Sequence, residues 1–263
     1  MTGTEARRAL KARLRGRQRL FAAWTSFGHP GIAEIFSMGP FDFVGIDLEH
    51  STINQSESQR IIAATQAEGV CCLPRVATHD AEMIKRCLDS GADGIIAPMV
   101  SSAAEAERLA GLVKYSPAGN RSFGVARAQR YGAAFEEYVT DWNDSSIFVP
   151  QIESVEAVES ISTILDNEHV DAVMIGPYDL SGSLGVPGQL HHPTVKQAID
   201  TVVEACQRHK KGCGTQLVEP DRATVEDAFA AGFSFVVLAS DVFLLWKWVE
   251  SMGDMIDSCG KAD

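Results

Sequence analysis

Short apolar, β-branched runs alternate with amphipathic stretches along the whole chain. The apolar runs cover residues 19–24, 42–49, 71–76, 93–100, 147–153, 171–176, 212–217 and 233–239. Between them, apolar residues recur at helical spacing, for example in AEMIKRCLDSGA at 81–92 and EAVESISTIL at 156–165. This alternation is typical of βαβ units and a parallel sheet.

The number of units favours a (β/α)₈ barrel. Eight units in 263 residues average about 33 residues each, and barrels of this kind typically have about 250 residues. The competing fold, a doubly wound open sheet, would be expected to carry a Gly-x-Gly-x-x-Gly loop after an early strand, and none appears there. Helices are predicted to end near Gly69, Gly91, Gly212 and Gly232. We predict one α/β barrel domain over residues 1–263.

Composition and charge exclude several classes of protein. The chain is 45% hydrophobic and 22% charged, and no apolar run approaches the roughly 18 to 20 residues of a membrane span. The formal net charge of -12 makes nucleic acid an improbable partner. We therefore expect a globular protein in water that binds neither membranes nor nucleic acid.

The N-terminal segment and the cysteines bear on the compartment. The first 20 residues hold seven Arg or Lys against one Glu, as in organellar transit peptides, but we favour a short, solvated basic helix. The six cysteines show no C-x-x-C spacing, which favours reduced, buried thiols over disulfides or zinc. We predict a cytoplasmic location.

Polar side chains end most of the apolar runs. In a barrel the carboxyl ends of all strands meet at one rim, where the active site is built. The residues at the predicted strand ends are Trp24, Glu49, His50, Arg75, Pro98, Met99, Gln151, Glu153, Gly176, Pro177, Tyr178, Asp179 and Gln216. The sequence therefore predicts a polar mouth above an apolar interior.

Glu153 and Asp179 are the strongest candidates for metal ligands, because neighbouring strands five and six would bring them together. Two carboxylates, completed by waters and a chelating substrate, suit Mg²⁺ or Mn²⁺. Zinc is disfavoured because no His or Cys cluster accompanies them. Each acid taken alone could instead cap the helix or turn that follows it.

His50, Arg75 and Asp89 are candidates for acid–base and anion chemistry. Asp47 lies three residues before His50, and its carboxylate could fix the imidazole tautomer of a general base. Arg75 at a strand end requires an acid or an anionic ligand. Asp89 could pair with His50 or Arg75, or be an ordinary residue at a helix end.

Two further segments suggest anion binding. GPYDLSGSLG at 176–185 is a Gly-rich turn whose backbone N–H groups could hold a carboxylate, with Gln151 as a second donor. The irregular segment 115–132 is long for a compact barrel and carries Arg121, Arg127 and Arg130, which either contact an anionic aldehyde or, as we prefer, solvate the loop. No lysine ends a predicted strand, which favours a metal over a Schiff base for stabilising a carbanion.

Several of these segments together resemble the HpcH/HpaI aldolase family, metal-dependent (class II) pyruvate aldolases with a (β/α)₈ fold. They are FDFVGIDLEH, LPRV, IKRCLDSGADGIIAPMV, SPAGNRSFG, QIES and IGPYDLSGSLG, which occur in order through the barrel. A similarity in LKARLRGRQRLFAAW also argues that the basic N-terminus belongs to the mature protein.

The resemblance implies reversible cleavage of a 4-hydroxy-2-oxo acid to pyruvate, or hydroxypyruvate, and an aldehyde, through an enolate stabilised by Mg²⁺, Mn²⁺ or Co²⁺. It implies that Glu153 and Asp179 bind the metal and that His50, steadied by Asp47, moves protons through a water. Arg75 would hold the enolate oxyanion, and Asp89 would support His50 and Arg75 from the same or a neighbouring subunit.

The same resemblance implies substrate contacts and an assembly. Gln151 and the backbone at Gly176, Pro177 and Tyr178 would bind the substrate carboxylate, with Trp24 and Arg121 as further candidates. The family forms hexamers, as trimers of dimers that exchange the last helix, and DVFLLWKWVESMGDMI at 241–256 is apolar enough for this.

The chain also departs from the family pattern. Ser51 replaces the usual small Gly or Ala after the histidine, and the loop reads RSFGVARAQRYG, so the aldehyde is left open. The alternatives are a CoA-ester lyase of the citrate lyase β type and a non-catalytic barrel that binds an oxo acid.

Overall fold

Eight parallel strands close into a barrel in the computed structural model, which describes residues 3–260. Strands that are consecutive in sequence are neighbours in the sheet, and β8 pairs with β1. The strands are β1 (Leu20–Thr25), β2 (Phe43–Asp47), β3 (Cys71–Arg75), β4 (Gly94–Ala97), β5 (Ile147–Ile152), β6 (Ala172–Ile175), β7 (Gly212–Leu217) and β8 (Phe235–Leu238). Each matches one predicted run, so the (β/α)₈ prediction is confirmed.

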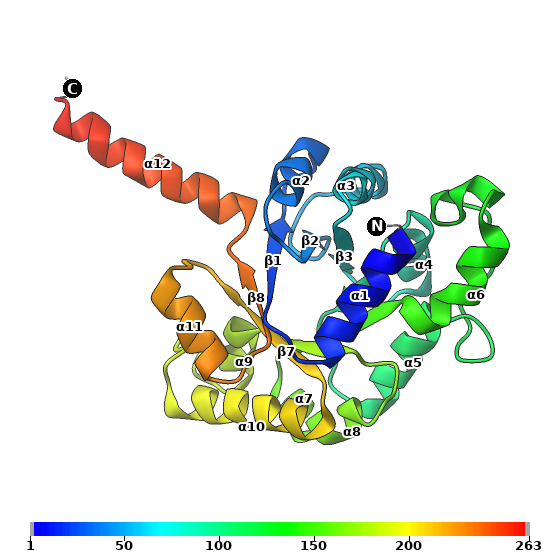
Figure 1. Cartoon of the computed structure of the whole chain (residues 1–263). Coiled ribbons are helices and arrows are strands. Elements are labelled where there is room, and N and C mark those ends of the chain that lie inside the picture. The colour runs from blue at the N-terminus through cyan, green and yellow to red at the C-terminus, as the bar shows by residue number, and fades with distance from the viewer. Residues whose placement is uncertain (1–2, 261–263) are drawn as a thin grey trace.

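Helices surround the barrel, except for the last one, which projects away from it (Figure 1). They are α1 (Gly3–Arg15), α2 (Pro30–Ser37), α3 (Gln55–Ala67), α4 (Ala81–Asp89), α5 (Ala103–Val113), the 3₁₀ helix η1 (Arg127–Gly132), α6 (Phe135–Ser145), α7 (Val155–Glu159), α8 (Ile161–Leu165), α9 (Pro177–Ser183), α10 (Pro193–His209), α11 (Arg222–Ala230) and α12 (Asp241–Ser258). None of these described helices is long and apolar enough to cross a membrane.

The interior of the barrel is filled by side chains that alternate along the strands. Trp24 and Phe235 are among the largest of them, and both are almost fully buried. Gly45 and Gly214 leave the space for these rings, because a Cβ would lie 2.2 Å from the Trp24 ring and 2.1 Å from the Phe235 ring, respectively. A packed interior has no room for substrate, so the chemistry must lie at a rim.

Helix α1 closes the N-terminal end of the barrel. Its Leu10 and Leu14 are buried and join the cluster of side chains inside the barrel. Its Arg7 and Lys11 side chains are largely buried against acids of the barrel, whereas Arg8, Arg13 and Arg15 form ion pairs but stay partly exposed. The prediction of a basic N-terminal helix is correct, and the prediction that it is solvated is correct only for its outer side.

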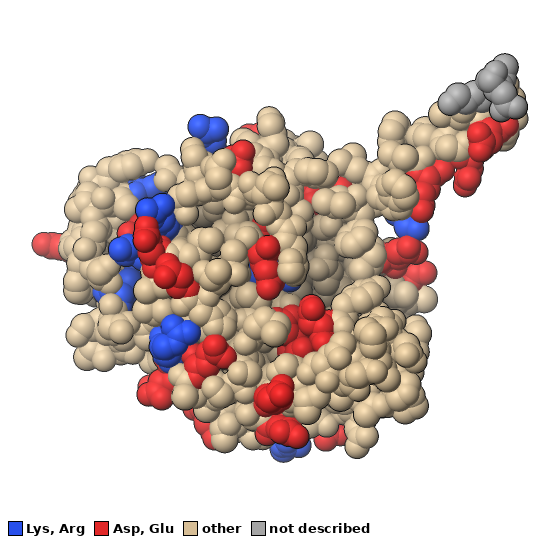
Figure 2. Space-filling model, turned by 180° about the vertical axis from the view of Figure 1, so that it is seen from behind, with Lys and Arg blue, Asp and Glu red and all other residues tan. Residues whose placement is uncertain are grey.

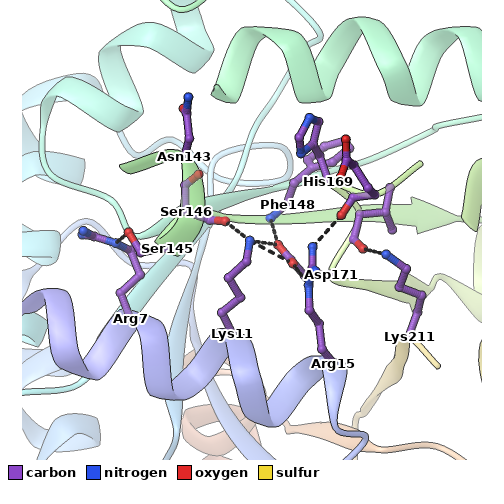
Figure 3. A network of polar contacts seen from close by, with 12 residues as sticks. Arg7, Lys11, Arg15, Asn143, Ser145, Ser146, Phe148, His169, Asp171 and Lys211 are labelled. Carbon is purple, nitrogen blue, oxygen red and sulfur yellow. Dashed lines mark hydrogen bonds and ion pairs between the residues drawn. The ribbon is translucent and has the colours of Figure 1, made fainter. Parts of the chain in front are cut away.

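Two basic side chains of α1 pair with the buried Asp171 (Figure 3). Lys11 Nζ lies 3.0 Å from Asp171 Oδ1 and donates to the Ser146 carbonyl at 2.6 Å. Arg15 Nε donates to Asp171 Oδ1 at 2.6 Å. Ser146 and Asp171 directly precede β5 and β6, so Lys11 and Arg15 attach α1 to the start of the sheet. The sequence pattern had predicted these side chains to be solvated.

Three of the four glycines predicted at helix ends have that role. Gly69, Gly91 and Gly232 have φ angles of 78°, 102° and 99°, which glycine adopts readily. Gly212 does not, because α10 ends at His209 with Lys210 as its left-handed C-cap, and Gly212 already belongs to β7. A Cβ at Gly212 would lie 3.0 Å from the Leu14 carbonyl oxygen, so glycine there permits the close approach of α1.

The cysteines are free thiols in the described chain. Cys71, Cys72, Cys87, Cys206 and Cys213 are buried, as predicted. Cys259 near the end of α12 is exposed, so the expectation of burial is wrong for this residue.

Candidate active site

Polar residues from β2 and β3 meet at the C-terminal rim of the barrel. Asp47 and Arg75 face each other in the register of these strands. Arg75 Nη2 donates to Asp47 Oδ2 at 2.8 Å and Nε to Oδ1 at 3.2 Å. Nε also lies 3.2 Å from Glu49 Oε2, and the guanidinium carbon is 5.2 Å from the centre of the Trp24 ring. Two acids thus compensate this buried charge, as burial requires.

His50 has an exposed imidazole at the same rim, with 66% of its side chain accessible. Asp47 does not hold this imidazole, because its carboxylate is turned toward Arg75 and accepts the backbone N–H of His50 at 3.0 Å. The acid near the ring is Glu49, with Oε2 at 3.8 Å from Nε2. The predicted Asp47–imidazole contact is therefore wrong, and Asp47 fixes the backbone position of His50 instead.

Glu153 follows β5 and is buried at the mouth of the barrel. Its Oε1 accepts the backbone N–H of Met99 at 2.5 Å and its Oε2 accepts Gln151 Nε2 at 2.5 Å. Glycine is required beside it, because a Cβ at Gly176 would lie 2.4 Å from Glu153 Oε2. The carboxylate is thus fixed on three sides.

Glu153, Glu49 and Asp179 lie close enough to influence one another electrostatically. Burial raises the pKa of Glu153, and the negative charges of Glu49 and Asp179 raise it further. The hydrogen bond from the Met99 backbone N–H lowers this pKa but does not outweigh them. Burial also raises the pKa of Glu49, which Arg75 partly offsets. In residues 3–260 no ion pair to a base is made by Glu153 or Asp179, so negative charge accumulates between them.

These residues fit a hard divalent cation. No group of three or more His, Cys, Asp or Glu side chains in the described range forms a complete protein metal site. Mg²⁺, however, typically takes only one or two carboxylates and keeps waters or substrate oxygens as its other ligands. The buried Oε1 of Gln151 beside Glu153 has no hydrogen-bond partner in the structure. An unpaired buried acceptor is satisfied by a donor, a water or an ion, and a hydrated cation held by Glu153 would supply one of these.

The turn after β6 brings Asp179 and backbone donors to this place. Gly176 is the N-cap of α9 and offers no side-chain cap, and Pro177 occupies the first turn. Tyr178 and Asp179 are exposed at the start of the helix. The backbone N–H groups of this turn are free of side-chain caps, as the predicted carboxylate site requires.

Asp89 and Arg121 pair with each other. Arg121 Nη2 donates to Asp89 Oδ1 at 2.9 Å. The guanidinium is buried against three rings, with its carbon 4.6 Å from the centres of Tyr115 and Trp142 and 5.5 Å from that of Tyr138. The predictions that Arg121 solvates the loop or contacts substrate do not describe this buried position.

This pair lies at the N-terminal end of the barrel, opposite the mouth. Asp89 ends α4 and segment 115–132 follows α5, and both helices run back from the mouth. Arg127 in the same segment donates to the Ser90 carbonyl at 3.0 Å, next to Asp89, whereas Arg130 is exposed. Within one chain, therefore, Asp89 does not reach His50 or Arg75, and this loop does not surround the mouth of its own barrel. A contribution of Asp89 or the loop to the site of a neighbouring subunit stays a prediction.

Glu49 is the residue of the site to which the sequence pattern gave no role. It links Arg75 to the acids of the mouth and lies near His50. Its position at the end of a strand, two residues after Asp47, was the available signal.

Comparison with known proteins shows to which family this chain belongs. The sequence model described as HpcH/HpaI aldolase/citrate lyase matches residues 20–247, which include all eight strands. The chain belongs to the HpcH/HpaI aldolase/citrate lyase family. The resemblance stated from the sequence motifs is thereby confirmed.

Similar members of the HpcH/HpaI family include two named aldolases. The 2-keto-3-deoxy-L-rhamnonate aldolase of Shigella sonnei is 34% identical over 236 residues, covering 89% of this chain and 87% of the relative. The hydroxypyruvate/pyruvate aldolase of Sagittula stellata is 33% identical, covering 89% and 92%. Among solved structures, the HpcH/HpaI aldolase of Desulfitobacterium hafniense is 29% identical, with a TM-score of 0.85 over 94% of this chain and 95% of that one.

Proposed function

We propose that this family member is a divalent-metal-dependent lyase that reversibly cleaves a 4-hydroxy-2-oxo acid to pyruvate or hydroxypyruvate and an aldehyde. The observation that carries the proposal is the buried carboxylate of Glu153, which lies in the field of Asp179 and Glu49 without a basic partner of its own in the described chain. The names of the two aldolase relatives support 2-oxo acids as the substrate class.

Glu153 and Asp179 would hold the cation, which is Mg²⁺, Mn²⁺ or Co²⁺. A cation bound there supplies a Lewis acid that withdraws electron density from the carbonyl of the 2-oxo acid. Arg75 lies at the same rim with Nε and Nη2 engaged by Asp47, which leaves Nη1 to donate to the enolate oxygen. The stacked Trp24 ring and Asp47 keep the guanidinium in place before substrate enters.

His50 would take and return the proton of the reaction through a water, because its imidazole is exposed at the rim and its backbone is held by Asp47. The backbone N–H groups at the start of α9, around Gly176 and Tyr178, would bind the substrate carboxylate, with the second amide hydrogen of Gln151 as another donor.

The experiment that tests the proposal is exchange of the methyl protons of pyruvate with deuterium, followed by proton NMR with added Mn²⁺ or Mg²⁺. Fast exchange that a chelator abolishes is expected, and Glu153→Gln should lose the metal-dependent part while remaining folded. A protein that merely binds an oxo acid would show no exchange. A CoA-ester lyase would instead require a CoA thioester, and solved citrate lyases are too distant to favour this alternative, at 14% and 15% identity.

We also propose that the protein is a homo-oligomer. Helix α12 projects from the barrel and exposes large apolar side chains (Figure 1). These are Val242, Leu244, Leu245, Trp246, Trp248, Val249, Met255 and Ile256. An exposed apolar face of this size requires a cover, and exchange of α12 between two copies would provide it. Light scattering should give a multiple of 28.4 kDa, with six copies as the predicted assembly.

The remaining proposals concern binding partners and the cellular compartment. The face in Figure 2 carries many acidic side chains and scattered basic ones, which agrees with the net charge of -12 and argues against nucleic acid as a partner. The unpaired buried cysteines support a reducing, cytoplasmic environment.

A further inference from the structure

The peptide group between Pro98 and Met99 is held from both sides. Its N–H donates to Glu153 Oε1 at 2.5 Å, and its carbonyl oxygen lies 2.5 Å from His79 Nε2. The other ring nitrogen of His79 lies 2.8 Å from Glu105 Oε1. A continuous chain of hydrogen bonds therefore runs from Glu105, through the imidazole and one peptide group, to Glu153.

The loop that carries this peptide group is anchored at successive residues. Val100 N donates to the Gln151 carbonyl at 3.3 Å, and Ser101 N donates to Glu105 Oε2 at 3.0 Å. Met99 has a φ of 53°, a conformation with a steric cost for non-glycine residues, and its side chain is 54% exposed. Packing of that side chain cannot hold the strained turn, so the hydrogen bonds do.

We propose that His79 and Glu105 are positioning residues for Glu153, an inference that rests on the metal-dependent function proposed above. The carbonyl of Pro98 and the carboxylate of Glu105 can only accept, so both ring nitrogens of His79 must donate in this arrangement. This bond polarises the peptide group and strengthens the donation of its N–H to Glu153. Glu105 orients the ring, in the way that outer partners orient metal ligands in other proteins.

Two substitutions of His79 separate positioning from simple loss of the ring. The amide nitrogen of His79→Gln reaches the place of Nε2 and can donate to Pro98, whereas the amide of His79→Asn reaches only that of Nδ1. Isothermal titration with Mn²⁺ should show a Kd about 10-fold higher for His79→Asn, because losing a residue that orients a metal ligand typically costs about 10- to 100-fold in affinity. The Kd for His79→Gln should stay within about 3-fold of the wild type.

A second pair of variants tests the acid. Glu105→Ala should weaken Mn²⁺ binding by about 10-fold. Glu107→Ala removes the same charge from an exposed position of the same helix and should leave binding unchanged. Thermal unfolding of all four variants is measured in parallel.

The outcomes distinguish the two proposals. Wild-type Mn²⁺ affinity in His79→Asn and Glu105→Ala, with or without a lower Tm, would overturn the positioning role while Glu153→Gln still loses binding. Equal weakening by His79→Gln and His79→Asn would overturn the donor role of Nε2. If the wild type binds no Mn²⁺, or Glu153→Gln binds it normally, the metal function fails and the positioning role fails with it.

Discussion

Replacing Gly176 by alanine should damage the active site without disturbing the barrel. The backbone there has a φ of -97° and a ψ of 88°, so alanine is not excluded by its own conformation. The added Cβ, however, would lie 2.4 Å from Glu153 Oε2 and 2.9 Å from Gln151 Nε2. Both contacts lie inside the metal site proposed above.

The size of the effect follows from these distances. Non-bonded carbon atoms pack best at about 3.5 Å, so the carboxylate of Glu153 must move by about 1 Å. Ligand distances in metal sites tolerate only about 0.2 Å. A displacement of about 1 Å can lower the rate about 10²-fold. We therefore expect Gly176→Ala to reduce Mn²⁺-dependent deuterium exchange about 100-fold and to raise the Kd for Mn²⁺ by at least about 10-fold.

Gly182→Ala is the matched control. It lies in the same helix α9, has a Cβ position with nothing within 4 Å, and should keep the wild-type exchange rate. Proton NMR measures exchange, titration calorimetry measures Mn²⁺ binding, and thermal unfolding verifies that both variants are folded. A folded Gly176→Ala variant with wild-type exchange and wild-type affinity would refute the role of this contact and the placement of the site around Glu153.

Three further predictions follow from other residues. His50→Ala should lower the rate of proton exchange by roughly 10² to 10⁴ if the imidazole is the general base, so a change of only a few-fold in the NMR assay would remove it from the mechanism. Burial raises the pKa of Glu153, and a metal binds only the ionised carboxylate. The Kd for Mn²⁺ should therefore increase as the pH falls through that pKa, by about tenfold per pH unit for one displaced proton. A Kd that does not change with pH in calorimetry would contradict this. Burial, then the charge of Lys11, lowers the pKa of Lys114 from 10.5 to about 7. Between these two pH values Lys114 is protonated in the unfolded chain but not in the folded one, so it should make the free energy of unfolding rise with pH by about 1.4 kcal/mol per pH unit. Urea unfolding at pH 8 and pH 9 should show a smaller rise in Lys114→Met than in the wild type. An equal rise in both proteins would contradict the prediction.

The eight strands were predictable because the signal that defines them is local. Each apolar run ends near a polar residue or glycine, and the alternation with helical periodicity restricts the sheet to parallel pairing. The predicted boundaries differ from the observed ones, as β2 ends at Asp47 and not at Glu49. Residues 48–51 instead form a turn, because the Asp47 carboxylate accepts the backbone N–H groups of Glu49 and His50.

The candidate site was predictable to the extent that it depends on strand order. Glu153 and Asp179 follow neighbouring strands of a barrel, so any barrel with this topology brings them to one rim. The hydrogen-bond partners of the site residues were not predictable, because they depend on the directions in which the side chains point. Asp47 turned toward Arg75 rather than the His50 ring, and His79 reached the Pro98 carbonyl from another loop.

The sequence by itself determined the barrel, its packed interior and the residue types at its mouth, because hydrophobic periodicity and strand ends are properties of consecutive residues. Only the tertiary structure decided that α1 closes the barrel floor, that Asp89 meets Arg121 there, and that Gly176 leaves room for Glu153. These contacts join residues far apart in the chain, and their energies depend on distances of a few ångströms that no local pattern encodes.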